Sequence, residues 1–431
     1  MLIVRVDPTI AEIIARLETE ETEKNELLEE TRHRISDFTF SHAFPLSEEL
    51  ALDPGLATVL PCTPLQEAVL TRFHSSHTST AYFTAFPMLL APSTNIDHLR
   101  ESWEVVIDHT PILRTCFSDT PDGWAQLILH EAPMHLEVVV LASEDYSGEV
   151  QKGLERAGRR FRKEKTAPPL SMLLMITPSE KRIVALNIFH ALYDGTSLPF
   201  ILEDVQKAYL TPRLFEGRKC QFSDVLPWIL AVDVDGARAF FERNVSVPST
   251  RLVGAKAEGV DEDTRDEVVA ETIPESPELA QLCKTLNCTA QAVFQTVWAS
   301  VLSRYLGTVA TMGVVVSGRN YPLDDVETVI GPTFNTIPCS VNLGAPSWEQ
   351  VIREVHRFNT EAIPYHNTPL RLVHKWFGCT AEEPLFESLL VYQKDGGAKQ
   401  EEDDDQKLWE LVDGVTVADV SLSRGVGTEE G

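Results

Sequence analysis

The chain has 431 residues and a mass of 48.1 kDa, which is enough for two or three ordinary domains. Its 65 acidic residues outnumber its 37 basic ones, and the formal net charge is −28. An acidic excess of this size repels phosphate backbones and anionic lipids, which argues against nucleic acid or a membrane as partner. The sequence contains no run of about 18 apolar residues and does not begin with a secretory signal, so we expect a cytoplasmic protein.

The seven cysteines are scattered along the chain, and none belongs to a Cys-x-x-Cys pair. Their odd number and their spacing argue against both a disulfide framework and a structural zinc site. His74 and His77 are three residues apart but have no third ligand nearby. We therefore expect no metal site.

Residues 1–45 are predicted to form an acidic helical segment or linker. Thr9 and Glu12 match a capping box, and the isoleucines that follow fall on one helical face. Glutamates then dominate the sequence up to residue 30. A solvated helix or tether is the favoured interpretation, and a docking helix for a partner is the alternative.

Between residues 60 and 395, strand-like and helix-like patterns alternate, which is typical of a layered α/β fold. A helix that includes Ile96, Leu99, Val106 and Ile107 is predicted to run up to the turn at Thr110-Pro111. The apolar run at 183–189, IVALNIF, predicts a strand buried on both faces. Ser197 is expected to cap the helix that follows it.

The polar stretch 246–276 is predicted to connect this first block to a second one. Ser276 opens a short helix, and Asn287-Cys-Thr289 separates it from a longer helix that ends at Gly307. The inward face of the longer helix is expected to carry four apolar residues: Val293, Val297, Val301 and Leu302. A strand is predicted at 312–316, and the acidic sequence after Lys394 is typical of a disordered loop.

Most familiar catalytic motifs are absent from the sequence. It has no phosphate-binding Gly-Lys loop, no dinucleotide-binding glycine pattern and no His-Glu-x-x-His. Ser197 lies in GTSLP, which lacks the second glycine of a nucleophile elbow, so a serine hydrolase is disfavoured.

One segment, FHALYDG at 189–195, combines a titratable group with rigid supports. The predicted buried strand ends at Phe189 and presents His190, and the chain then turns through Asp194 and Gly195 into a helix. A histidine held between two rigid elements suits a general base. The spacing alone leaves open a purely structural histidine.

This segment, together with several others in order, resembles the condensation domains of nonribosomal peptide synthetases. His190-x-x-x-Asp194-Gly195 is similar to the active-site motif of that family and of related acyltransferases. The other matching segments, in chain order, are PCTPLQEAVL (61–70), HTPILRTCF (109–117), FSDVLPWI (222–229), VSGRNYPLDDVETVIGPTFNTIPCSV (316–341), YHNTPLRLVHKWFG (365–378) and PLFESLLVYQ (384–393). The sequences of these segments are most similar to those of fungal synthetases, and the suggested subgroup is the synthetases that make hydroxamate siderophores.

The resemblance implies an α/β fold of two chloramphenicol-acetyltransferase-like halves arranged in a V. Residues 46–245 would form the first half and residues 246–431 the second, which is expected to be incomplete. The reaction implied is amide or ester bond formation between an acyl thioester and an amine. Both substrates would be carried on the phosphopantetheine arms of carrier proteins, with no cofactor bound directly and with adenylation domains as further partners.

The resemblance also implies roles for individual residues. His190 is the expected catalytic residue, with the backbone N–H of Gly195 as an oxyanion donor. Asp194 would pair with Arg319 and hold the active-site loop. A second set is assigned to the substrate tunnel: Phe189, Ser197 and Asn335.

Two departures from the family pattern leave alternatives open. Phe189 replaces the usual first histidine of the motif, and Phe189→His is expected to be tolerated. The short sequence after residue 393 suggests that the second half is loosely packed. A degenerate homologue that only binds a carrier protein or another partner is one alternative. A coenzyme-A-dependent acyltransferase is another, although its Asp-Phe-Gly-Trp-Gly motif is absent, and an epimerase is disfavoured by the SGRN turn.

Overall fold

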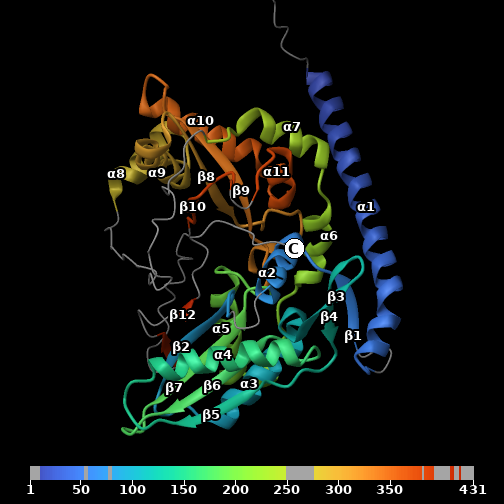
Figure 1. The fold of residues 1–431 in the computed structure, drawn as a ribbon, viewed down its shortest axis with the longest axis vertical. Helices are drawn as coiled ribbons and strands as arrows, with labels where there is room; N and C mark the ends of the chain where they lie inside the picture. The colour runs from blue at the N-terminus through green and yellow to red at the C-terminus, as the bar shows by residue number, and fades with distance from the viewer. Residues whose placement is uncertain are drawn as a thin grey trace, which may run out of the picture.

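The computed structural model describes residues 10–52, 57–75, 80–248, 276–380, 383–392, 408–411 and 417–418. Two lobes make up the molecule, and each contains a sheet with helices packed against it (Figure 1). Most of the predicted connection at 246–276 and the acidic loop at 394–406 lie outside the described residues.

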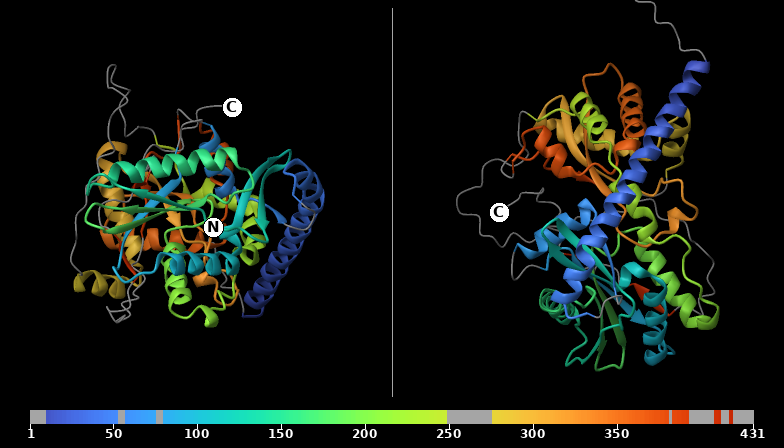
Figure 2. Two further views of the ribbon diagram at one scale, coloured as in Figure 1. Left: turned by 90° about the horizontal axis from the view of Figure 1, so that it is seen from below. Right: turned by 90° about the vertical axis from the view of Figure 1, so that its right-hand side faces the viewer.

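The main sheet of the first lobe places β7 at its centre. Its strands run in the order β11-β2-β7-β6-β5, with β12 also paired to β2. Helix α4 covers one face, and α3 and α5 pack side by side on the other (Figures 1 and 2). The bounds are β2 (Phe83–Leu90), α3 (Ile96–His109), β5 (Leu136–Val140), α4 (Ser147–Lys163), β6 (Leu170–Ile176), β7 (Arg182–Phe189) and α5 (Ser197–Leu210). Residues 183–189 are all buried, which confirms the strand predicted from their apolar run.

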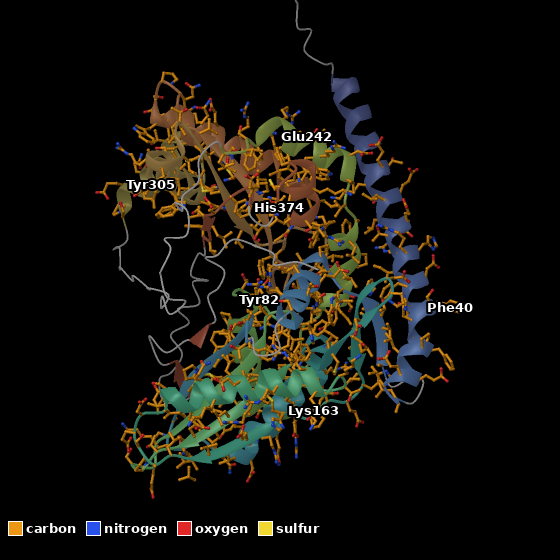
Figure 3. All side chains as sticks on the ribbon, viewed as in Figure 1. Phe40, Tyr82, Lys163, Glu242, Tyr305 and His374 are labelled. Atoms are coloured by element: carbon orange, nitrogen blue, oxygen red, sulfur yellow. The ribbon has the colours of Figure 1, made fainter. Side chains whose placement is uncertain are left out.

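A smaller sheet in the order β1-β4-β3 lies beside the first one and supports the long helix α1. The bounds here are α1 (Ile10–Glu49), β1 (Ala57–Pro61), α2 (Pro64–His74), β3 (Thr115–Thr120) and β4 (Gly123–Leu129). Leu28, Thr31 and Leu46 of α1 are buried, while Phe40 projects outward and is 88% exposed (Figure 3). Most of the described side chains of α1 are exposed, as expected for a solvated helix, and the few buried ones form a contact face toward the smaller sheet.

The second lobe is built on a three-stranded sheet in the order β10-β8-β9. The strands are β8 (Val309–Val316), β9 (Asn335–Asn342) and β10 (Leu389–Leu390); the helices are α8 (Pro277–Leu286), α9 (Ala290–Leu306), α10 (Trp348–Glu361) and α11 (Leu370–Trp376). The predicted break between α8 and α9 is confirmed, because Asn287 ends α8 in the left-handed region and Thr289 caps α9. The predicted strand at 312–316 lies within β8.

The prediction for the inward face of α9 is only half right. Val293 and Leu302 are buried, but Val297 and Val301 are 55% and 44% exposed. Small and polar residues take their place in the packed face, among them Ala292, Thr296 and Ala299. Because α9 is apolar on more than one side, its periodicity did not identify the side that packs.

Two parts of the chain belong to a different lobe than the predicted boundary at residue 245 assigns them. The first is helix α7 (Val234–Asn244), which follows α6 (Phe222–Leu230) and whose Phe240 and Phe241 are buried in the core of the second lobe. Conversely, β11 (Trp409–Leu411) and β12 (Val417–Ala418) pair antiparallel with β2 of the first lobe. The chain thus crosses between the lobes more often than a single boundary implies.

Candidate active site

The site is built where β7 ends and α5 begins. The apolar strand delivers His190 directly after Phe189, and the backbone N–H of His190 donates to the carbonyl of Tyr82 at 2.8 Å. Asp194 then stabilises the start of α5, because its Oδ1 accepts from the backbone N–H groups of Thr196 and Ser197 at 3.1 and 2.8 Å. Ser197 is the first residue of α5 and Thr196 holds the N-cap position without a side-chain bond, so the predicted cap by Ser197 is wrong and Asp194 satisfies these N–H groups instead.

The imidazole of His190 is fixed in one orientation. Its Nδ1 lies 2.9 Å from the carbonyl oxygen of Tyr193, an acceptor, so Nδ1 carries the proton and Nε2 keeps its lone pair. Burial lowers the pKa of His190 below its ordinary value of 6.5, while the nearby Asp194 carboxylate acts in the opposite direction. The side chain is thus neutral at pH 7 and has an unprotonated nitrogen that can accept a proton.

Asp194 and Arg319 form a bidentate ion pair across the two lobes. Both guanidinium–carboxylate contacts are 2.8 Å long, and the side chains are only 4% and 6% exposed. Thr333 donates its N–H to Asp194 Oδ2 at 3.2 Å, and its hydroxyl, which donates to the Ser317 carbonyl at 2.7 Å, lies 3.2 Å from the same carboxylate oxygen. One carboxylate therefore joins the His190 turn to two segments of the second lobe, as the resemblance implied for Asp194 and Arg319.

Gly318 shapes the turn that presents Arg319. Its φ is +61°, which a residue with a side chain rarely adopts, and a Cβ atom there would lie 2.0 Å from the carbonyl oxygen of Thr333. The close approach of the two backbones therefore requires glycine.

The backbone N–H of Gly195 is placed to be a donor. Gly195 is exposed in the turn, and among the residues that the structure describes none accepts a hydrogen bond from this N–H. Its role as oxyanion donor stays a prediction.

Phe189 and Ser197 both have fully buried side chains. Phe189 is fully buried among Phe73, Phe83 and Phe161, with ring centroids 5.0 to 5.2 Å apart. Ser197 is also fully buried, and its hydroxyl donates to Asp194 Oδ1 at 2.9 Å. These positions are structural, so the tunnel assignment of both residues is corrected.

Asn335 lies at the interface between the two lobes, called the seam below, and lines a small cavity there. Its amide nitrogen donates to the carbonyls of His366 and Thr368 at 2.7 and 2.8 Å, so it also holds that loop. The residues that line the cavity are Thr63, Pro64, Leu65, Ile229, Pro332, Thr333, Phe334, Asn335 and Asn367. Contact of Asn335 with a substrate stays a prediction.

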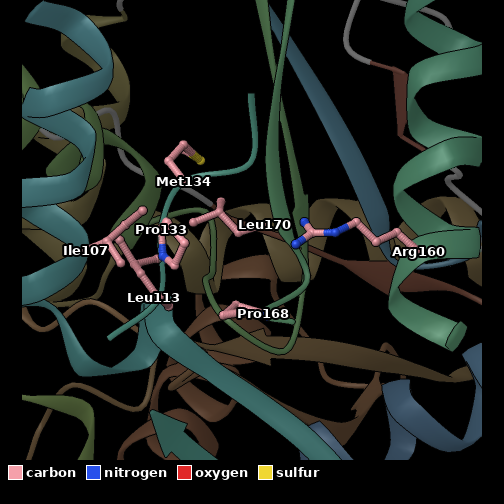
Figure 4. Close-up of a pocket in the computed structure, with 8 residues that line it drawn as sticks. Ile107, Leu113, Pro133, Met134, Arg160, Pro168 and Leu170 are labelled. Carbon is pink, nitrogen blue, oxygen red and sulfur yellow. The ribbon is translucent and has the colours of Figure 1, made fainter. Parts of the chain in front are cut away.

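A second cavity lies within the first lobe and has no catalytic group. Figure 4 shows its mainly apolar lining, which includes Ile107, Leu113 and Leu170, with Arg160 at one side. Arg160 pairs with Glu164 at 3.0 Å.

Among the described residues, no group of three or more His, Cys, Asp or Glu side chains could hold a metal ion. None of the described helices combines the length and apolar character needed to cross a membrane.

Two aromatic residues at the site were missed by the sequence analysis. Tyr193 stacks on His190 with ring centroids 4.8 Å apart and an angle of 17°, and Phe334 approaches the same imidazole at 5.1 Å. Tyr193 lies inside the motif and Phe334 inside a matching segment, but neither position is specified by the family pattern used. Only the folded chain brings these two rings to His190.

The fold and the arrangement of His190, Asp194 and Arg319 define the class: a two-lobed α/β protein with an acyltransferase-type His-x-x-x-Asp-Gly site. The condensation-domain family model matches residues 56–418. The chain therefore belongs to the condensation-domain family.

Relatives of the chain include fungal nonribosomal peptide synthetases. It is 32% identical over 363 residues to nonribosomal peptide synthetase Ao415 of Arthrobotrys oligospora, covering 83% of this chain and 10% of the relative. It is 30% identical over 426 residues to nonribosomal peptide synthetase sidC of Arthroderma benhamiae, covering 93% and 8%. The chain thus spans about a tenth of the length of the curated relatives that it matches.

Solved structures support the same fold at low sequence identity. The condensation domain of the monacolin K polyketide synthase MokA aligns with a TM-score of 0.59 at 16% identity, covering 77% of this chain and 80% of that one. The X-domain from teicoplanin biosynthesis aligns with a TM-score of 0.60 at 18% identity, covering 76% of each chain. These likenesses establish two chloramphenicol-acetyltransferase-like halves.

Proposed function

We propose that this chain catalyses amide (or ester) bond formation between an acyl thioester and an amine (or hydroxyl), with both substrates carried on phosphopantetheine arms of carrier proteins. The observation that carries the proposal is the state of His190. It is a neutral imidazole at the seam of the lobes, with Nδ1 committed to the Tyr193 carbonyl and Nε2 available.

The reaction needs one base and a fixed geometry. The amine nitrogen attacks the thioester carbonyl carbon, and His190 Nε2 accepts the proton that the nitrogen loses. The C–S bond of the tetrahedral intermediate then breaks, and His190 returns that proton to the departing sulfur, which leaves as the thiol of the donor arm. The Gly195 N–H would donate to the oxyanion. A general base contributes roughly 10²–10⁴-fold, and holding two tethered reactants together supplies much of the rest.

A non-catalytic homologue that binds a carrier protein is the second candidate function. The observation in its favour is the second lobe, where the described residues form only a three-stranded sheet and leave one side of α9 exposed. The ordered contacts of His190, Asp194 and Arg319 favour the enzyme instead, since a protein that only binds has no need of a desolvated base.

The experiment supplies an acyl-loaded donor carrier and an aminoacyl-loaded acceptor carrier and follows the product by mass spectrometry. The enzyme reading predicts a product that depends on both carriers and on the chain. Carrier binding without product, by a chain shown to be folded, supports the non-catalytic reading. Turnover with acyl-coenzyme A and a free amine, but not with carriers, supports the coenzyme-A reading.

A further inference from the structure

Three consecutive residues of the second lobe meet the seam, and each makes a different contact. Thr333 donates its N–H to Asp194 and its hydroxyl to the Ser317 carbonyl, and Asn335 donates to the carbonyls of His366 and Thr368. Phe334, between them, faces the imidazole of His190 at 5.1 Å with an interplanar angle of 52°. Because both of its neighbours are held by hydrogen bonds, the backbone of Phe334 has little freedom to move away.

The first lobe supplies the other aromatic contact. Tyr193 is 3% exposed and lies almost parallel to the imidazole, while its carbonyl accepts the bond from His190 Nδ1. The Tyr193 hydroxyl interacts with Thr84 of β2, which holds the ring in place. His190 is therefore contacted by one ring from each lobe.

We propose that Phe334 is a positioning residue for His190: its ring, presented by the second lobe, excludes water from the imidazole and completes with Tyr193 an aromatic shell that fixes the plane of the base. The catalytic consequence rests on the proposed function, whereas the physical effect on His190 does not. Since Thr333 is bound to Asp194, the Asp194–Arg319 pair also places Phe334.

Phe334 is expected to act on His190 by keeping water away from the imidazole and not through charge. The charged groups at this point are Asp194, on the same turn as His190, and Arg319, which is paired to it. The contacts from β2 and from residues 333–335 come from uncharged residues: Tyr82, Thr84, Thr333, Phe334 and Asn335. Removing the Phe334 ring therefore admits water without changing any charge beside the imidazole.

The test is an NMR titration of histidine-labelled protein, with the His190 signal assigned by its loss in His190→Gln. In Phe334→Ala, hydration of the imidazole is expected to raise the pKa of His190 by at least about half a unit. Phe334→Leu keeps much of the volume and should give a smaller rise. Phe40→Ala, which removes an exposed ring of α1, serves as the control with no rise.

An unchanged His190 titration in folded Phe334→Ala overturns the proposal. If Phe334→Ala fails to fold, Phe334→Leu decides: a rise supports the shell, and a titration identical to that of the parent protein overturns it.

Kinetics separate this inference from the proposed function. If both hold, Phe334→Ala lowers kcat about ten-fold with little change in KM, and the acidic limb of the pH–rate profile moves to higher pH. A raised pKa with an unchanged kcat overturns the positioning role and leaves the proposed function intact. Full activity of His190→Gln overturns the proposed function, while the titration still reports on the shell.

Discussion

Asp194 is the residue on which most of the seam depends. Its carboxylate accepts from Arg319 and Thr333 of the second lobe and from the backbone and hydroxyl of Ser197 in its own lobe. Both members of the ion pair are almost fully buried. Removal of one member would leave the other as an unpaired buried charge.

Asp194→Ala is therefore expected to destabilise the fold by roughly 3–5 kcal/mol, because Arg319 loses its buried partner. The free energy of unfolding in urea measures the effect. Glu155→Ala, which removes an exposed partner of Arg159, is the matched control and should change stability by about 0–1 kcal/mol. Equal stability of the two variants would contradict a strong dependence on Asp194.

The family pattern predicts that Phe189→His is tolerated, but the structure predicts a loss of stability. The new imidazole would replace an apolar ring surrounded by Phe73, Phe83 and Phe161. A buried polar group without a partner costs roughly 1–3 kcal/mol, in addition to the lost packing. Thermal unfolding compared with Phe189→Leu tests this, and a histidine variant as stable as the leucine variant would contradict it.

His366 makes stability depend on pH. Burial lowers its pKa from 6.5 to about 4, so the unfolded chain binds more protons than the folded one between these values. The free energy of unfolding therefore does not depend on His366 above pH 6.5, and it falls by roughly 3 kcal/mol in total as the pH drops from 6.5 to 4. Urea unfolding from pH 7 to 4.5 should show a shallower decline for His366→Gln than for the parent protein; parallel declines would contradict the assignment.

At the scale of elements, the turn 317–319 controls how the lobes meet. Gly318→Ala would place a methyl group against the Thr333 carbonyl and force an unfavourable φ, so Arg319 should lose its alignment with Asp194. Lower stability and lower condensation activity are both expected. Gly148→Ala in the first turn of α4, where a Cβ meets nothing within 4 Å, is the control. A Gly318→Ala protein indistinguishable from this control would show that the turn relaxes without consequence.

The local pattern of apolar residues predicted where helices and strands lie better than it predicted which side of a helix is buried. The strand before His190 and the helix after it follow from strong short-range signals, an apolar run and a turn sequence. The bonds from Asp194 to the start of α5 were missed because serine and aspartate are both good capping residues, and only the folded backbone shows that Ser197 is already the first helical residue. The orientation of α9 was missed because its apolar residues exceed one helical stripe.

Contacts between distant segments were the least predictable from the sequence. The pairing of β11 and β12 with β2 joins residues more than 300 positions apart, and two or three residues carry no periodicity. Phe334 reaches His190 for the same kind of reason, since its place depends on Thr333 binding a residue of the other lobe. The Asp194–Arg319 pair was anticipated only through resemblance to a family.

For the whole molecule, the two lobes together make the site. The first lobe supplies His190 and its carbonyl acceptor, and the second supplies Arg319, Thr333 and Phe334. Neither lobe alone holds the imidazole in the observed environment. The proposed function requires that His190, held in this way, is the base of a condensation reaction.

The most direct measurement is the rate of amide formation by His190→Ala with loaded donor and acceptor carriers. The account predicts a folded protein that forms product at least about 10²-fold more slowly than the parent chain, because only the base is lost. A variant that condenses the two substrates at close to the parent rate would remove His190 from the mechanism and contradict the account.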